Sequence, residues 1–280
     1  MNAAVTVFFL IIKVFSLYFL AVSLFGLCRR RTPEPAARLR RFAVLIAARN
    51  EESCIAGLIE SLRAQHYPPE LVDIWVLPNN CTDRTAEAAR RAGAQVLEMP
   101  ASVRSKGAAL HTAAKALLRS TRNYDAFCVF DADNEADPAF LSEMNRALDR
   151  TAIVKSRILA KNRTQAGISA CYEIYFCSAN NFLNRAREAM GLSARVIGTG
   201  FAIRRDLLET LDGFPCRTLT EDAELYAACL CRGARIGYCE TAVTYDEEPV
   251  TWRASLVQRR RWMSGILQVA RLTLPELLAN

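Results

Sequence analysis

Two carboxylates, Asp131 and Asp133, follow directly after the apolar run 126–130, which predicts a buried strand. Side chains two residues apart at a strand end can converge on a hard divalent cation, which prefers carboxylate and phosphate oxygens. A solvated Asp-rich turn would have the same sequence, and so short a pattern does not decide between the two. The position at a strand end favours a Mg²⁺ or Mn²⁺ site held by Asp131 and Asp133.

A second acidic pair, Glu221 and Asp222, opens a predicted helix over 221–231. Carboxylates at a helix N-terminus are stabilised by the helix dipole, so the pair could serve folding alone. A carboxylate aimed at a hydroxyl can also take its proton during nucleophilic attack. Asp222 and Glu221 are therefore candidates for general base catalysis.

The third group, Gln258, Arg261 and Trp262, lies on a predicted amphipathic helix over 252–272. Residues three and four apart are neighbours on a helix, so the group presents an amide, a phosphate-binding fork and a flat ring together. A basic helix face resting on anionic lipid would look similar. The combination favours a sugar diphosphate.

The elements that position these groups alternate between strand and helix patterns. Strands are expected over 42–48, 71–77, 95–99, 126–130 and 153–159, and helices over 52–65, 82–92, 106–118 and 138–148. A helix over 167–189 and a strand over 195–203 follow. This alternation predicts an α/β fold with a mostly parallel central sheet flanked by helices. Ligands bind beyond the carboxyl ends of such strands, where the polar segments 48–51, 79–83 and 131–133 stand.

The N-terminal segment 3–28 is apolar and, as a helix, would be ~39 Å long, which is enough to cross a bilayer. Arg29, Arg30 and Arg31 follow, and this placement predicts a cytoplasmic location for the rest of the chain. A cleaved signal peptide is less consistent, because the basic cluster follows the apolar run. Lys13 inside the span indicates snorkelling or a contact with a membrane partner subunit.

We therefore expect a single-pass protein of the inner cell membrane in three parts: a transmembrane anchor (1–28), a basic juxtamembrane linker (29–41) and a catalytic domain (42–280). The linker carries a net +5 of the chain's total of +7. This local charge suits membrane lipid and argues against nucleic acid as a partner. The ten cysteines contain no C-x-x-C pair and indicate reduced, mostly structural thiols.

Six segments together resemble the family 2 glycosyltransferases, which have the GT-A fold, and especially the membrane-bound synthases of cellulose, chitin and hyaluronan. In chain order they are IAARNEES, NNCTDRT, VFDADN, GTGFAIRRDLL, LTEDAEL and QRRRW. Each is weak alone, but their order and spacing over residues 42–265 make a specific signal. The resemblance implies inverting transfer of a sugar from a nucleotide-sugar donor, commonly a UDP-sugar, to a glycan or lipid-linked acceptor.

The resemblance also implies roles for individual residues. The nucleoside would be held by Ala48, Arg49, Glu51 and Asn79, and the phosphates by Arg104, Lys106 and Arg261. Asp131 would contact the ribose or the metal, and Asp133 the metal. Gly198, Thr199 and Gly200 would line the acceptor side, Gln258 and Trp262 would hold the diphosphate and acceptor sugar, and Asp222 would be the base.

One position departs from the family pattern, because Asn79 stands where the family usually has an aspartate that grips the base. Asn can still accept a hydrogen bond through its oxygen, but it carries no charge. Two alternatives stay open at this point. One is a sugar-nucleotide-binding pseudoenzyme that serves as a subunit of a synthase complex, and the other is a nucleotidyltransferase, although the loop AARNEES lacks that class's glycines.

Overall fold

A computed structural model describes residues 3–27 and 35–279 of the chain, so the predicted Arg29–Arg31 cluster lies outside the described residues. Within the described part, eight strands form one sheet. They are β1 (Phe42–Ala48), β2 (Val72–Pro78), β3 (Gln95–Val96), β4 (Ala126–Asp131), β5 (Glu135–Ala136), β6 (Ile153–Ala160), β7 (Phe201–Arg204) and β8 (Ile236–Asp246).

The strand order is β3-β2-β1-β4-β7-β6-β8-β5. The first four strands are parallel, β6 and β8 are parallel to each other, and β7 runs antiparallel between the two groups. The short edge strand β5 pairs antiparallel with β8. The expected α/β fold with helices on its sheet is confirmed, and its sheet is mixed.

Both faces of the sheet are buried, which explains why its central strands read as continuous apolar runs. One face carries Phe42, Val44 and Ile46 of β1 against α2 (Ile55–Arg63), α3 (Thr85–Arg91) and α5 (Phe140–Ala147). The other carries Ala43 and Leu45 against α4 (Lys106–Leu118), α8 (Arg205–Thr210) and α9 (Glu221–Cys231). A 3-10 turn, η1 (Pro69–Leu71), precedes β2.

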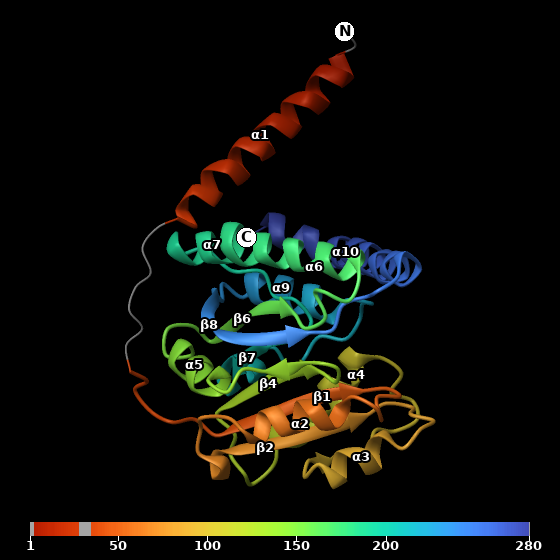
Figure 1. The fold of residues 1–280 in the computed structure, drawn as a ribbon. Helices are drawn as coiled ribbons and strands as arrows, with labels where there is room; N and C mark the ends of the chain where they lie inside the picture. The colour runs from red at the N-terminus through yellow and green to blue at the C-terminus, as the bar shows by residue number, and fades with distance from the viewer. Residues whose placement is uncertain (1–2, 28–34, 280) are drawn as a thin grey trace.

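Above this unit lies a second layer of helices (Figure 1). It contains α6 (Gly167–Ser178), the π-helical turn η2 (Ala179–Asn184), α7 (Arg185–Ala189) and α10 (Trp252–Ala279). The apolar helix α1 (Ala3–Phe25) rises from this layer and contacts η2 and α7. A Cβ at Gly26 would lie 2.4 Å from the carbonyl oxygen of Asn181, so the end of α1 sits directly on the π-helical turn.

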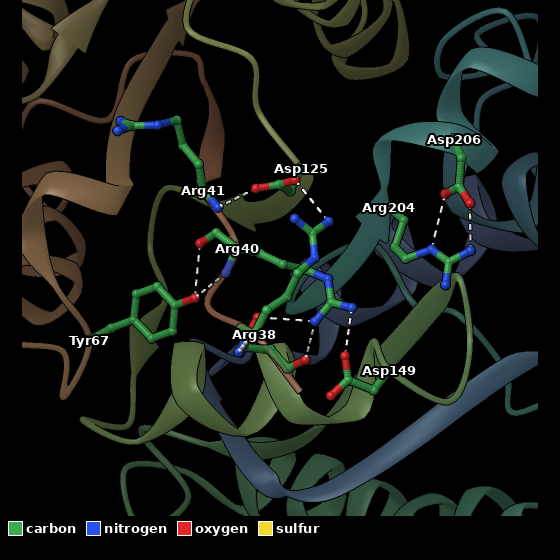
Figure 2. Close-up of polar contacts among 9 residues, drawn as sticks. Arg38, Arg40, Arg41, Tyr67, Asp125, Asp149, Arg204 and Asp206 are labelled. Atoms are coloured by element: carbon green, nitrogen blue, oxygen red, sulfur yellow. Dashed lines mark hydrogen bonds and ion pairs between the residues drawn. The ribbon is translucent and has the colours of Figure 1, made fainter. Parts of the chain in front are cut away.

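The last arginines of the expected linker are bound to the α/β domain that follows them (Figure 2). Arg40 is buried, and its guanidinium donates to the Asn145 carbonyl (2.8 Å) and to Asp149 (2.6 Å). Arg38 pairs with Asp125 at 2.9 Å, and the Arg41 amide donates to the same carboxylate. The positive charge of residues 38–41 is therefore matched by acids of the domain.

Several elements differ from the sequence-based expectation: β5 and α8 were not expected, β3 is shorter than the strand expected over 95–99, and η2 interrupts the helix expected over 167–189. The strand expected over 195–203 begins only at Phe201, because the amide and carbonyl of Gly198 bond to the side chains of Asp222 and Lys106 and not to a neighbouring strand. Strand β8 was not expected at all. It pairs with β6 across an irregularity between Ser156 and Arg157, so its sequence shows no regular alternation.

Candidate active site

The predicted aspartates stand where β4 ends, at the carboxyl edge of the parallel group. The Asp131 amide donates to the Thr199 hydroxyl (3.1 Å), and its carboxylate lies 2.5 Å from the Lys106 ammonium. Lys106 is the first residue of α4, and Ser105 caps that helix by accepting from the Ala108 amide. A strand end and a helix start thus bring the two charges together.

Lys106 is the point where the predicted groups meet. Its ammonium also lies 3.2 Å from Glu221 and donates to the Gly198 carbonyl at 2.6 Å. Burial disfavours its charge, but Asp131 and Glu221 outweigh burial and raise the pKa of Lys106 above its usual range. The lysine therefore stays charged between the acids of β4 and α9.

Asp222 begins the same helix as Glu221, and its carboxylate accepts from the Gly198 amide at 2.9 Å. Burial, with the Asp222 and Asp131 charges added, raises the pKa of Glu221, although Lys106 lowers it. A Cβ placed on Gly198 would lie 3.4 Å from Lys106 Nζ, 3.8 Å from Asp131 Oδ2 and 3.9 Å from Asp222 Oδ2. Three charged groups therefore border the space beside Gly198. The Lys106 ammonium is suited to binding phosphate, Asp131 is a candidate metal ligand, and Asp222 is a candidate base.

The other two residues of this loop face inward. Thr199 is 1% exposed, and its hydroxyl contacts Asn134 and the Asp131 amide. Gly200 has a φ of +60°, and a Cβ there would lie 2.4 Å from the Thr244 hydroxyl. Buried Lys155 donates to the Thr199 (2.7 Å) and Gly200 (3.1 Å) carbonyls. Of the predicted acceptor-side loop, Gly198 borders the site, while Thr199 and Gly200 fix its position.

Acidic residues gather beside Asp133, and two of them were missed by the sequence analysis. Burial and the Asp131 charge raise the pKa of Asp133 to about 7. Burial, Glu248 and Asp133 raise the pKa of Asp246 well above its usual value, and burial, Asp133 and Glu173 raise that of Glu248 to about 7. Asp246 ends β8 and bonds to Asn134 at 2.6 Å. A strand assignment for 236–246 would have signalled Asp246 as a further strand-end carboxylate.

This concentration of buried, mutually repelling carboxyls suits a divalent cation. Among the described residues, no three His, Cys, Asp or Glu side chains converge as metal ligands. A Mg²⁺-type site needs only one or two carboxylates when substrate phosphates supply further oxygens. Asp131 and Asp133 therefore fit a cation that binds together with a diphosphate.

The predicted nucleoside residues lie at the ends of β1 and β2. Ala48 is buried, and its carbonyl accepts from the Asn79 amide at 2.9 Å. Arg49 is exposed, whereas Glu51 is half-buried and accepts from the Cys54 thiol at 3.1 Å. Since β1 lies between β2 and β4, these residues stand beside the Asp131 group along one sheet edge. Arg104, predicted to bind the phosphates, is exposed two residues before α4.

The trio on α10 lies apart from the carboxylates. Tyr172 of α6 donates to the Gln258 amide oxygen at 2.9 Å and packs edge-on against the Trp262 ring. Arg261 is exposed, and with Gln258 it lines an open cavity of about 550 Å³ at the start of α10. None of the residues that line this cavity belongs to the Asp131 and Asp222 group. Trp262 and Ile197, the neighbour of Gly198, pack on one small apolar cluster.

Comparison with known proteins identifies the family of the chain. Residues 40–265 match the family model described as Glycosyltransferase like family 2. The chain is 28% identical to the "Probable glycosyltransferase YdaM" of Bacillus subtilis, over 83% of this chain and 56% of that protein. It is 26% identical to the Beta-monoglucosyldiacylglycerol synthase of Synechocystis, over 79% of this chain and 47% of that protein. The chain thus spans about half the length of these relatives.

Solved structures show the same fold. The mannosyltransferase PcManGT of Pyrobaculum calidifontis, in complex with GDP-Man and Mn²⁺, superposes with a TM-score of 0.73 at 21% identity, covering 92% of this chain and 71% of that one. Glucosyl-3-phosphoglycerate synthase of Mycobacterium tuberculosis, in complex with Mn²⁺ and UDP, has a TM-score of 0.55 at 21% identity, covering 82% and 78%. With its GT-A fold and the match over residues 40–265, this chain belongs to glycosyltransferase family 2.

Proposed function

We propose that the chain is an inverting glycosyltransferase that moves a sugar from a nucleotide-sugar donor to a membrane-associated acceptor at the cytoplasmic face of the inner cell membrane. The observation that carries this proposal is the space beside Gly198. Lys106, Asp131 and Asp222 lie within van der Waals range of one Cβ position, although they come from three different elements. Transfer needs these three chemical groups at one point.

Asp222 is the general base in this proposal. The Gly198 amide holds one carboxylate oxygen at 2.9 Å, which leaves the second to accept a proton from an acceptor hydroxyl. Removal of that proton makes the hydroxyl oxygen the nucleophile that attacks the anomeric carbon in line. The attack inverts that carbon and releases the nucleoside diphosphate.

Lys106 stabilises the departing diphosphate, because Asp131 and Glu221 keep it charged. Asp131 and Asp133 would hold the Mg²⁺ or Mn²⁺ ion together with phosphate oxygens. When bound, that ion supplies Lewis-acid neutralisation of the leaving group. Gln258, Arg261 and Trp262 would bind the diphosphate and the acceptor sugar from the α10 side, and Arg104 would bind the phosphates. The nucleoside end would be bound by Ala48, Arg49, Glu51 and Asn79.

The membrane location rests first on α1. Val5–Phe25 is long and apolar enough to cross a membrane, and most of it is exposed on the described chain. The end of α1 is fixed to the domain, because Val22 is buried and the Ser23 hydroxyl donates to the Phe182 carbonyl at 3.3 Å. The second helical layer therefore lies where α1 would enter the bilayer (Figure 1).

That layer turns its apolar side chains outward. Helix α10 buries Ser255, Gly265, Val269 and Thr273 against the domain, and it exposes its arginines and most of its larger apolar residues. The exposed apolar residues are Trp252, Leu256, Val257, Met263, Ile266, Leu267, Leu272, Leu274 and Leu278 on α10, with Ile174, Tyr175 and Phe182 on α6 and η2. A helix at a water-facing surface has the opposite arrangement. These faces support contact with membrane lipid and favour a lipid-linked acceptor over a soluble glycan.

A direct test is to reconstitute the purified chain in vesicles with a panel of nucleotide sugars, with and without a lipid acceptor. We expect acceptor-dependent release of a nucleoside diphosphate and a product whose anomeric configuration, read by NMR, is opposite to that of the donor. Tight donor binding without turnover would identify a pseudoenzyme that serves a membrane partner subunit. Retention of configuration would overturn the mechanism.

Membrane orientation is tested separately. An Asn2→Cys variant, in a background whose other reactive thiols are removed, should be labelled by an impermeant reagent only from outside the cytoplasmic compartment, because Arg29–Arg31 lie on one side of the span. Labelling from the cytoplasmic side alone would reverse the topology.

A further inference from the structure

Asn79 stands where β2 ends, at the far side of the candidate site from Asp131. Strand β1 lies between β2 and β4, so two strand spacings, about 10 Å, separate the ends of β2 and β4. In the proposed nucleotide-sugar complex the diphosphate lies at the end of β4. The end of β2 is then the place for the base, because the ribose must span the interval.

Hydrogen bonds on the neighbouring residue fix the orientation of the Asn79 amide. The amide nitrogen of Asn80 donates to the Val103 carbonyl (2.5 Å) and to the Asn79 amide oxygen (2.8 Å). A carbonyl can only accept, so the atom of Asn80 that faces Val103 must be its NH₂ group. The same NH₂ group then requires an acceptor on Asn79, which settles that the oxygen of Asn79 points at Asn80.

The other end of the Asn79 amide is consequently its NH₂ group. Asn79 is only 5% exposed, and this nitrogen makes no hydrogen bond to any residue of the described ranges 3–27 and 35–279. A side-chain donor that has no protein partner at the edge of a binding site is available to a bound ligand. The oxygen that the sequence analysis expected to replace the family's aspartate is already occupied.

We propose that Asn79 donates a hydrogen bond to the ring nitrogen of the donor's base, so that this chain selects a cytidine nucleotide over a uridine nucleotide. At ring position 3, cytosine has an unprotonated nitrogen that accepts, whereas uracil has an N–H that donates. Uracil would instead place its N–H donor against the NH₂ donor of Asn79. This assignment rests on the proposed use of a nucleotide-sugar donor and changes the expected base from uracil to cytosine.

Proteins with this fold bind different nucleotide bases, so side chains of the site determine which base is bound. The two structural neighbours described above were solved with a guanosine and a uridine nucleotide, respectively. At the end of β2 in this chain, Asn79 presents a hydrogen-bond donor, whereas an aspartate of the same size would present an acceptor. A site that hydrogen-bonds one partner rejects a mismatched one because a buried polar group is left unpaired.

The test uses calorimetry to compare the affinities of CDP and UDP for the full chain in detergent with Mn²⁺. We expect the wild type to bind CDP about 10- to 100-fold more tightly than UDP, the range that one unpaired buried group produces. The isosteric Asn79→Asp variant should reverse the order, since both its oxygens accept and one still meets Asn80. Asn79→Leu should bind both weakly and without preference.

Asn123→Asp is the matched control, because it makes the same change in charge at an exposed residue before β4. It should leave the preference unchanged, and urea midpoints of all variants would show that they fold. Equal binding of CDP and UDP by the wild type, or an order that Asn79→Asp does not alter, would overturn the assignment of Asn79 alone. Failure of every nucleoside diphosphate to bind the folded chain would overturn it together with the proposed function.

Discussion

The three glycines Gly198, Gly200 and Gly57 allow a test of the space beside Gly198. A methyl group on Gly198 would lie 3.4 Å from Lys106 Nζ and 3.8 Å from Asp131 Oδ2, which are ordinary contact distances. The backbone of Gly198 is not left-handed, so Gly198→Ala should fold with nearly wild-type stability. The methyl would instead fill the space where the reacting groups must meet.

The expected loss of turnover follows from the size of that methyl. Reacting atoms pushed about 1 Å from their working positions lose about 100-fold in rate. Gly200→Ala should behave differently, because its φ of +60° and a contact of 2.4 Å to the Thr244 hydroxyl would cost about 2 kcal/mol or more of stability. Gly57 lies within α2 with nothing within 4 Å of its Cβ position, so Gly57→Ala should keep full activity and gain up to about 1 kcal/mol.

The assay pairs nucleoside diphosphate release at saturating donor with urea unfolding of the same preparations. Gly198→Ala should lose activity at wild-type stability, Gly200→Ala should lose stability, and Gly57→Ala should lose neither. Wild-type turnover by Gly198→Ala would refute the reasoning, because the space it fills would then have no part in the reaction.

Three further outcomes are expected. Asp222→Asn should lower transfer by about 10²- to 10⁴-fold while leaving donor affinity nearly unchanged, and a variant that keeps more than a tenth of wild-type turnover would contradict the base assignment. Asp133→Ala should abolish both activity and Mn²⁺ binding, and a wild type whose activity survives a chelator would show that the metal site is wrong. Arg40→Met should lower the free energy of unfolding in urea by about 1–3 kcal/mol, because it leaves the Asn145 carbonyl without its buried donor and Asp149 without its partner, whereas Arg38→Ala, at an exposed pair, should lower it by under about 1 kcal/mol.

The fold was predictable where burial leaves a local signature. β1 is apolar throughout, and β4 is apolar up to Phe130, because helices cover both sheet faces. The helices between them carry apolar residues every three to four positions, the spacing of one buried helix face. The same logic led to Asp131 and Asp133, since their place at a strand end is visible in the chain. The role of each as a metal ligand stays a prediction.

Features that depend on contacts between segments far apart in the chain left no local sequence pattern. Asp246 meets Asn134 across 112 residues of sequence, and the antiparallel pairing of β8 with β5, in which Glu135 lies opposite Tyr245, brings it there. Composition marked residues 38–41 as a basic patch, but it could not show that Arg40 is buried against Asp149. The orientation of the Asn79 amide follows from the hydrogen bond between Asn80 and the Val103 carbonyl, which the residue types alone do not reveal.

The packing of α10 on α9 links the proposed α10 group to the proposed base. A Cβ at Gly265 would lie 2.4 Å from the side chain of Thr220, the residue just before the acidic pair that opens α9, so only glycine permits this approach. The Gln268 amide oxygen accepts from the Leu219 amide at 3.0 Å, which holds the same two segments together. Helix α10 carries Arg261 on the turn before Gly265, and its outer face exposes both arginines and large apolar side chains. Any force that positions α10, including contact with lipid, therefore also positions the start of α9, where Asp222 stands.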